Sequence, residues 1–267
     1  MVTRAIAEDL GKGDLSAQLI PIEQHASASI VCRETAVLCG TTWFDEVFRQ
    51  IDPSISIKWL AQEGETLSAK QTLCTLHGCA RSLLSGERAA LNFLQSLSAT
   101  ASTAQRYAEA VAGTGVKVLD TRKTLPGWRL AQKYAVKVGG CHNHRIGLFD
   151  AFLIKENHIA AVGGISAAIS TARKINPNTL LEVEVETLEQ LQEALAAQPD
   201  RIMLDNFDLP LLEQAVNLTA GKIDLEASGN ITLANIRTKA ETGVNYISIG
   251  ALTKDIKAID LSMRFNP

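Results

Sequence analysis

A repeat in the second part of the chain limits the possible folds more than any other feature of the sequence. Short apolar runs alternate there with longer stretches of helical periodicity. The runs lie at residues 116–119, 151–154, 180–185, 201–204, 223–227 and 246–249. Parallel strands need a crossover of about a dozen residues or more between them, and that crossover is usually a helix. The repeat therefore predicts an α/β domain built around a parallel sheet.

Each of these runs ends in residues that can bind a ligand. They are residues 120–123, Lys155, Glu184 with Glu186, Asp205, residues 228–230, and Gly250. In barrels of parallel strands the active site forms at the carboxyl ends of the strands. One polar residue after a strand would mean little, because loops are polar. A whole series of them favours a single cleft.

The first part of the chain has a different pattern and predicts a separate α+β domain. Short β-rich runs at residues 28–31, 36–39, 55–60 and 71–76 are separated by turn signals such as Asp52-Pro53. Apolar residues at helical spacing over residues 85–111 predict a long helix that joins two domains. We expect an N-terminal domain over residues 1–100 and a C-terminal domain over residues 101–267, because a single core stops growing near about 250 to 300 residues.

Charge and cysteine usage narrow the class of protein. The net charge of −3 offers no overall field to hold nucleic acid or an anionic membrane surface, so neither is an expected partner. The 5 cysteines are scattered without paired CxxC spacing, as reduced thiols are. The opening residues contain no apolar run long enough for a signal peptide or a membrane span. We expect a cytoplasmic protein.

The proposed cleft collects positive charge. Its cations are Arg122, Lys123, Arg145 and Lys155, with His142 and His144 beside them. Gathering like charges costs free energy unless an anion meets them, and a hydrogen bond to a charged group contributes roughly 1.5 to 3 kcal/mol. The pattern predicts a multiply anionic ligand, although one or two of the cations could pair with Glu or Asp as structural ion pairs.

Two carboxylates face these cations in the predicted arrangement, Glu184 and Asp205. Such groups can bind Mg²⁺, directly or through water, hold ribose hydroxyls, or stabilise positive charge on a sugar ring. Glu182 and Glu186 alternate with Glu184 at period two, so all three share one face of the strand. Only the local register decides which of them is used.

Two turns have the composition of phosphate sites, while two other motifs are weak. Ser228-Gly229-Asn230 and Ile249-Gly250-Ala251 each lead into a helical pattern, where exposed backbone N–H groups can bind phosphate. The cluster at residues 141–144 could suggest zinc, but its ligands are crowded and no second cluster has the spacing of a zinc site. The glycines at residues 113–115 lack the remainder of a dinucleotide fingerprint.

The ordered set of these motifs resembles the quinolinate phosphoribosyltransferase family. The matching strings are EDLGKGD (8–14), GERAALN (86–92), DTRKTLPG (120–127), NHR (143–145), LIKENH (153–158), EVEV (182–185), LDNF (204–207) and residues 243–253. They occur in the expected order from near residue 8 to near residue 255.

The resemblance implies an architecture and a reaction. The family has an N-terminal α/β sandwich domain and an incomplete C-terminal (β/α) barrel, and it forms a homodimer in which each sandwich covers the partner's barrel. By that analogy Arg88 reaches the neighbouring active site. The reaction joins quinolinate to phosphoribosyl pyrophosphate and releases nicotinate mononucleotide, pyrophosphate and carbon dioxide in de novo NAD synthesis.

The resemblance also implies residue roles. Glu184, Asp205, Lys123 and Lys155 would be catalytic, and Glu184 and Asp205 would hold Mg²⁺ directly or through water or substrate. The implied substrate-binding set is Arg88, Thr121, Arg122, Lys123, His144, Arg145, Lys155, Glu184, Asp205, Ser228, Gly229, Asn230, Ile249, Gly250 and Ala251. The carboxylates of quinolinate and the phosphates of the donor would be held by Arg122, Lys123, His144, Arg145 and Lys155. The 5′-phosphate would lie at the turns that contain residues 228–230 and residues 250–251.

Two other functions remain open from the sequence. A Schiff-base aldolase could use Lys155 as a strand-end nucleophile, which would need a desolvated lysine in an apolar pocket. A divergent paralogue or a non-catalytic sensor of phosphate ligands could share the fold, because fold does not determine function.

Overall fold

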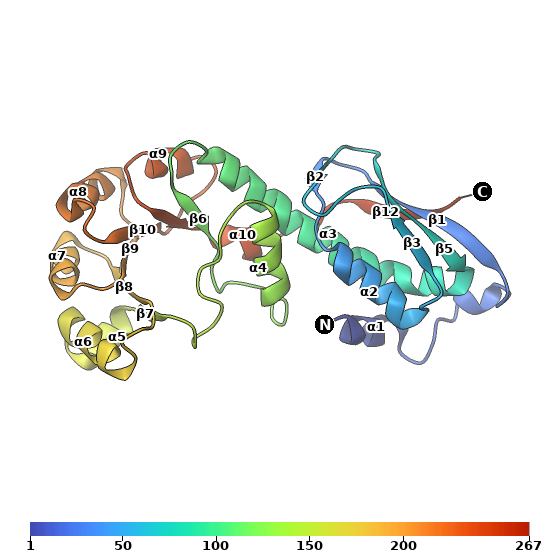
Figure 1. Ribbon diagram of the computed structural model, residues 1–267, viewed down its shortest axis with the longest axis horizontal. Helices are drawn as coiled ribbons and strands as arrows, with labels where there is room; N and C mark the ends of the chain where they lie inside the picture. The colour runs from blue at the N-terminus through green and yellow to red at the C-terminus, as the bar shows by residue number, and fades with distance from the viewer. Residues whose placement is uncertain (267) are drawn as a thin grey trace. The chain divides into compact units, whose positions relative to one another are not determined.

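The computed structural model describes residues 1–266 and divides into two compact units (Figure 1). The first unit comprises Met1–Gln105, Leu125–Gly140 and the segment from Asp255 onward. The second comprises Arg106–Thr124 and Cys141–Lys254. Each unit has its own sheet, so the two are described separately.

The first unit is built on an antiparallel sheet with the strand order β12-β1-β5-β3. Its elements are α1 (Val2–Leu10), a 3-10 helix (Ala17–Leu19), β1 (His25–Cys32), β2 (Ala36–Val37), α2 (Thr41–Ile51), β3 (Ser56–Trp59), β4 (Thr66–Leu67), β5 (Thr72–Cys79), most of α3 (Ala80–Ala110), α4 (Arg129–Val138) and β12 (Leu261–Phe265). Alternate residues of β1, such as Ala28 and Ile30, are fully buried, as expected for a sheet with one face against a core.

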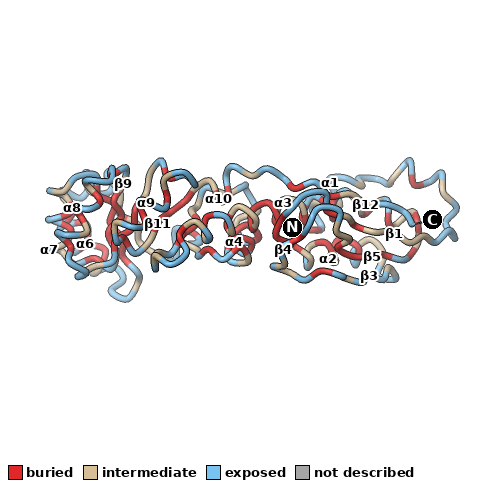
Figure 2. Tube along the Cα trace, turned by 90° about the horizontal axis from the view of Figure 1, so that it is seen from above, coloured by how far each residue is buried: buried red, intermediate tan, exposed pale blue. Residues whose placement is uncertain are grey.

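Helix α3 forms the other side of this core. Its buried face appears in Figure 2 as a red stretch, and Phe93 and Leu94 on it belong to the main apolar cluster. Gly86 lets α2 come close, because a Cβ built at Gly86 would lie 2.6 Å from Cε1 of Phe48. Although α3 has 31 residues, no helix among residues 1–266 is both long enough and apolar enough to cross a membrane.

The second unit is built on a six-stranded sheet with the order β6-β11-β10-β9-β8-β7. Every pairing in it is parallel. Its elements are β6 (Lys117–Leu119), β7 (Phe152–Ile154), α5 (Glu156–Val162), α6 (Ile165–Ile175), β8 (Leu181–Val185), α7 (Leu188–Ala197), β9 (Arg201–Asp205), α8 (Leu209–Thr219), β10 (Asp224–Ser228), α9 (Ile236–Ala240), β11 (Tyr246–Ser248) and α10 (Ala251–Lys254). The helices between strands make the crossovers that parallel pairing requires.

The two faces of this sheet differ in chemistry. The register pairs Glu184 with Met203 across β8 and β9, and Met203 with Glu226 across β9 and β10. The residues between them along each strand, such as Val183 and Leu204, are fully buried apolar side chains. Because side chains alternate along a strand, one face is apolar and the other carries the polar groups. The site is therefore confined to the polar face.

The predicted α/β architecture is confirmed, including every predicted strand. The long helix begins at Ala80, five residues before its predicted start at residue 85. Strands β4 and β12 are absent from the prediction. Residues 125–140 and β12 lie in the first unit although they follow the expected boundary at residue 100. Ala131 and Ala135 of α4 pack in an apolar cluster with Leu97 of α3, and β12 pairs antiparallel with β1.

Candidate active site

A cavity of about 370 Å³ opens on the polar face of the parallel sheet. Its lining comprises Thr121, Arg122, Lys123, His144, Arg145, Leu153, Lys155, Glu184, Met203, Asp205, Glu226, Ser228 and Ser248. Most of these side chains come from the six strands or from the segments that follow them, while His144 and Arg145 lie between α4 and β7. The carboxyl ends of the strands therefore converge on one pocket, as the sequence pattern predicts.

The segment after β6 brings three of the predicted residues to the pocket. The backbone N–H of Lys123 donates to Oγ1 of Thr121 at 3.1 Å, which tightens this turn. Thr253 Oγ1, from α10, donates to the backbone oxygen of Lys123 at 2.7 Å. Gly250 keeps the space beside it open, because a Cβ there would lie 3.2 Å from Cδ of Lys123. The turn before α10 thus shapes the Lys123 side of the pocket.

Asp120 holds in place the segment that carries His144 and Arg145. Its side chain is fully buried, and its two oxygens accept hydrogen bonds from His144 N at 2.9 Å and from Asn143 Nδ2 at 2.6 Å. Because a buried carboxylate needs such partners to offset its desolvation, the contact fixes the backbone of His144 next to the end of β6. Asp120 was not among the predicted site residues, although it opens the DTRKT string.

Two guanidinium groups lie close together in this part of the pocket. Burial is the main cause that lowers the pKa of Arg145, and the neighbouring charge of Arg122 lowers it further. Two guanidinium groups repel each other unless an anion lies between them or near them. The arrangement supports the prediction that this pocket binds a multiply anionic ligand.

Lys155 and Glu184 form an ion pair in the pocket. The carboxylate is largely buried, whereas the lysine side chain is 41% exposed. This is the structural pairing that the sequence left open for some of the cations. The aldolase alternative gains no support, because a Schiff-base lysine needs an apolar setting and Lys155 instead contacts a carboxylate. Glu186, the next residue on that face, is exposed beyond the end of β8.

The buried part of the polar face holds an acidic pair beneath the cations. Glu182 and Glu226 are both fully buried, and His144 Nε2 lies 2.9 Å from Oε2 of Glu182 and 3.5 Å from Oε2 of Glu226. Arg201 Nη1 contacts Oε2 of Glu226 at 3.2 Å. Burial is the largest cause that raises the pKa of each acid, and the charge of Glu182 raises that of Glu226 further.

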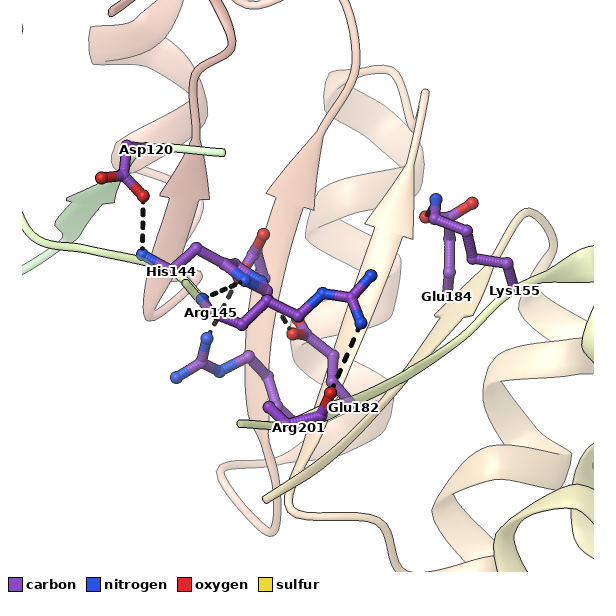
Figure 3. Close-up of polar contacts among 9 residues, drawn as sticks. Asp120, His144, Arg145, Lys155, Glu182, Glu184 and Arg201 are labelled. Atoms are coloured by element: carbon purple, nitrogen blue, oxygen red, sulfur yellow. Dashed lines mark hydrogen bonds and ion pairs between the residues drawn. The ribbon is translucent and has the colours of Figure 1, made fainter. Parts of the chain in front are cut away.

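In Figure 3, the group formed by His144, Arg145, Glu182 and Arg201 lies apart from the pair formed by Lys155 and Glu184. The charged residues that line the pocket or lie beneath it therefore form two groups with different surroundings. Cys141, which belonged to the weak zinc motif, is buried, and burial raises the pKa of its thiol to about 12. His144 of the same motif faces the carboxylate of Glu182.

The turn after β10 is held by asparagine side chains. Ser228 pairs with Asp205 at the ends of β10 and β9. Asn206 Nδ2 donates to Oδ2 of Asp205 at 2.7 Å, and Asn206 Oδ1 accepts from Nδ2 of Asn230 at 3.2 Å. Gly229 has φ +92°, and a Cβ there would lie 2.1 Å from Asn206 Oδ1. Only glycine fits this close approach of two turns.

The predicted residues thus fall into three groups. Nine line the cavity: Thr121, Arg122, Lys123, His144, Arg145, Lys155, Glu184, Asp205 and Ser228. Gly229 and Asn230 line an adjoining hollow with Asn206, while Ile249 is buried and Gly250 and Ala251 lead into α10. Arg88 lies on α3 in the first unit, where its Nη2 is 3.8 Å from Oε1 of Glu87.

Glu226 is the charged lining residue that the sequence interpretation missed, and the other unpredicted lining residues are Leu153, Met203 and Ser248. Glu226 lies inside the run at residues 223–227, whose apolar residues predict a strand and give no sign of a site residue. A usable signal existed, because Glu226 precedes Ser228 by two positions and side chains two apart share a face. His142, predicted beside the cations, is exposed, and its backbone oxygen accepts from Asp120 N at 3.0 Å.

Comparisons with known proteins agree along the whole chain. Residues 14–98 match the family model described as quinolinate phosphoribosyl transferase, N-terminal domain, and residues 100–264 match its C-terminal domain. A probable nicotinate-nucleotide pyrophosphorylase [carboxylating] of Synechocystis sp. is 42% identical over 263 residues, covering 97% of this chain and 89% of the relative. A protein of the same name from Bacillus subtilis is 42% identical, covering 96% and 89%. The solved nicotinate-nucleotide pyrophosphorylase of Francisella tularensis superposes with a TM-score of 0.97 at 47% identity, covering 99% of this chain and 94% of that one.

Proposed function

The chain belongs to the quinolinate phosphoribosyltransferase family, and from that premise we propose how its pocket carries out the family's reaction. The activity is the conversion of quinolinate and phosphoribosyl pyrophosphate to nicotinate mononucleotide, pyrophosphate and carbon dioxide in NAD biosynthesis. The assignment of individual residues to steps of this reaction is our proposal. The observation that carries it is the convergence of the predicted cations and both predicted acids on one cavity.

Quinolinate carries two carboxylates, and the cationic side of the pocket suits it. Arg122 and Arg145 can each make two parallel hydrogen bonds to a carboxylate, and Lys155 offers a third positive group. Leu153 and Met203 add apolar surface against which a pyridine ring can pack. Nicotinate lacks one carboxylate and would leave part of this buried charge unmatched, so the site should reject it.

The donor binds through its ribose and phosphates. In our proposal Glu184 and Asp205 face the ribose, while Lys123 meets the pyrophosphate. The 5′-phosphate lies at the turns of residues 228–230 and 249–251, where Gly229 and Gly250 allow the anion to approach the backbone. Asn206 supports this assignment, because it ties Asp205 to Asn230 and so fixes the acid relative to the first turn.

Magnesium fits the donor set that the pocket offers. Glu184 and Asp205 provide carboxylate oxygens in the same cavity, and oxygen is the ligand type that Mg²⁺ prefers. These two residues would hold the ion, directly or through water or substrate. When bound, Mg²⁺ would offset the negative charge of the pyrophosphate.

The residues then act on developing charge. As the bond from the anomeric carbon to pyrophosphate breaks, positive charge grows on the ribose, and Glu184 and Asp205 stabilise it. Arg122 and Arg145 hold quinolinate so that its ring nitrogen forms the new bond to that carbon. The alkylated ring then accepts the electron pair of the adjacent carbon–carboxylate bond, carbon dioxide leaves, and the ring carbon takes a proton from solvent.

We also propose a homodimer in which Arg88 reaches the partner's pocket. The Arg88 side chain is 59% exposed on α3, so it is available to contact another molecule. The first unit also exposes Leu15 and Leu19 almost completely, which is apolar surface that a second copy could cover. A cytoplasmic location agrees with the cysteines, all of which are free thiols.

An assay with purified protein tests the proposed function. With quinolinate, phosphoribosyl pyrophosphate and Mg²⁺ the protein should form nicotinate mononucleotide, and nicotinate should not replace quinolinate. The Arg122→Ala variant should lose this activity while it keeps the native circular-dichroism spectrum. Equal use of nicotinate, or an active Arg122→Ala variant, would overturn the proposal for the pocket.

A further inference from the structure

Both ring nitrogens of His144 are engaged by the protein. Nδ1 accepts a hydrogen bond from the backbone N–H of Arg145 at 2.8 Å. Nε2 lies 2.9 Å from Oε2 of Glu182 and 3.5 Å from Oε2 of Glu226. A nitrogen that accepts carries no proton, so the ring proton belongs on Nε2, facing the two acids. His144 therefore spans from the buried acids to the backbone of a substrate-binding arginine.

Arg201 also contacts the acidic pair. Arg201 Nη1 lies 3.2 Å from Oε2 of Glu226, and the guanidinium carbon of Arg201 lies 3.8 Å from the centre of the Tyr246 ring. The register places Glu182 beside Arg201 on neighbouring strands. Because Arg201 is fixed by a ring on one side and a carboxylate on the other, Glu226 has a rigid partner.

The backbone at residues 144 and 145 is thus held from two directions. Asp120 Oδ1 accepts from His144 N at 2.9 Å, and His144 Nδ1 accepts from the next N–H along the chain. Two consecutive N–H groups with buried acceptors leave little freedom to the segment that carries the Arg145 guanidinium. The His144 ring links this segment to both buried acids, and the charge of Glu182 also acts on the Arg145 guanidinium directly.

We propose that Glu182, Glu226 and His144 act as one positioning unit for Arg145, and that His144 does not hold a carboxylate of quinolinate through its ring nitrogens. The inference rests on the proposed function, because it concerns how the quinolinate pocket is set. It revises the role that the family resemblance implies for His144. Groups in a buried polar network depend on one another, because removal of one leaves its partners without a match.

Substitutions inside the unit test this idea. Glu226→Gln keeps the shape of the side chain but replaces the carboxyl group that faces His144 with an amide, and it should weaken quinolinate binding about tenfold. His144→Asn keeps an acceptor near the place of Nδ1 and should retain more affinity than His144→Leu, which keeps none. The Michaelis constant for phosphoribosyl pyrophosphate should change less than about twofold in all three variants.

A double-mutant cycle decides whether the three residues act together. The Glu226→Gln, His144→Asn double variant should bind quinolinate no more weakly than the worse single variant, because both changes break one chain of contacts. Effects that add, or a Glu226→Gln variant with wild-type affinity, would overturn the proposal. If Glu226→Gln fails to fold, Glu182→Gln replaces it in the same cycle.

Controls separate this inference from the proposed function. Asp200 is a matched carboxylate in the same unit, because it holds Arg173 Nη2 at 2.7 Å and accepts from Leu181 N at 2.6 Å. Asp200→Asn should leave quinolinate affinity unchanged. If wild-type protein binds quinolinate and Arg122→Ala does not, the proposed function stands even where the Glu226→Gln result overturns the positioning unit. If wild-type protein does not bind quinolinate, the proposed function itself fails.

Discussion

Lys155 and Glu184 form an ion pair inside the pocket, from the ends of the neighbouring parallel strands β7 and β8. An ion pair with one exposed partner contributes little to stability, roughly 0 to 1 kcal/mol. The ion pair matters because each of its groups can leave the other to contact a substrate. In the proposed reaction, Lys155 turns to a carboxylate of quinolinate and Glu184 turns to the ribose when the substrates bind. The pair keeps both charges in the pocket before either substrate arrives.

We predict that Glu184→Gln lowers kcat by about 100-fold or more, because the neutral amide cannot stabilise positive charge on the ribose. The Michaelis constant for quinolinate should change much less. Steady-state kinetics check both parameters. Glu186→Gln is the matched control, because Glu186 lies two residues further along the chain and is exposed beyond β8. Equal losses in the two variants would show that the effect is not specific to the pocket.

Arg145→Ala should lower kcat/KM for quinolinate by about 100- to 1,000-fold while the fold stays intact. The reason is that the variant loses a partly buried guanidinium, already crowded by Arg122, that would match a carboxylate of quinolinate. Arg173→Ala removes an arginine of the same unit that pairs with Asp200, and it should keep near-wild-type kinetics. Turnover close to wild type in Arg145→Ala would contradict the assignment of this pocket.

Gly229→Ala should weaken the binding of phosphoribosyl pyrophosphate and lower the free energy of unfolding by about 1 to 3 kcal/mol. The added Cβ would lie 2.1 Å from Asn206 Oδ1 and 2.9 Å from Asn206 N, so the two turns must separate. Gly163→Ala is the matched control, because its φ is +93° and nothing lies within 4 Å of its Cβ position. Urea unfolding and the donor's Michaelis constant should separate the cost of the backbone angle from the cost of the clash.

The buried acids predict a pH dependence of stability. Burial raises the pKa of Glu226 from 4.5 to about 8, so the folded protein holds this proton more tightly than the unfolded chain does. Such a group stabilises the fold below its ordinary pKa, and that contribution is lost as the pH rises through the folded-state value. The free energy of unfolding of wild-type protein should therefore fall between about pH 5 and about pH 8 more than that of Glu226→Gln. Parallel slopes for the two proteins in urea unfolding would rule this out.

Most of the second unit was predictable because its pattern is local. Each strand is a short apolar run, and each helix between strands has its own periodicity, so the parallel sheet follows from sequence order. The position of the site followed too, because parallel strands present their carboxyl ends together. Nine of the predicted site residues line this cavity, and all of them except His144 and Arg145 lie on a strand or directly after one.

Other features depend on contacts between distant parts of the chain. Strand β12 pairs Leu261 with Cys32, and no local pattern indicates that partner. The spacing to Ser228 places Glu226 on the face of the site, but its contacts with His144 and Arg201 depend on how distant segments pack. Sequence identifies His144 as a residue of the site but does not reveal which way its ring points. That orientation separates a substrate ligand from a positioning residue.

One measurement tests the central claim most directly. Quinolinate labelled with ¹³C in the carboxylate next to the ring nitrogen is incubated with the protein, phosphoribosyl pyrophosphate and Mg²⁺, and labelled carbon dioxide is counted against nicotinate mononucleotide. We predict equal amounts of the two products, and neither product with Arg145→Ala. Nicotinate mononucleotide without labelled carbon dioxide, or neither product with the wild-type protein, would contradict the claim that this pocket joins quinolinate to the sugar phosphate.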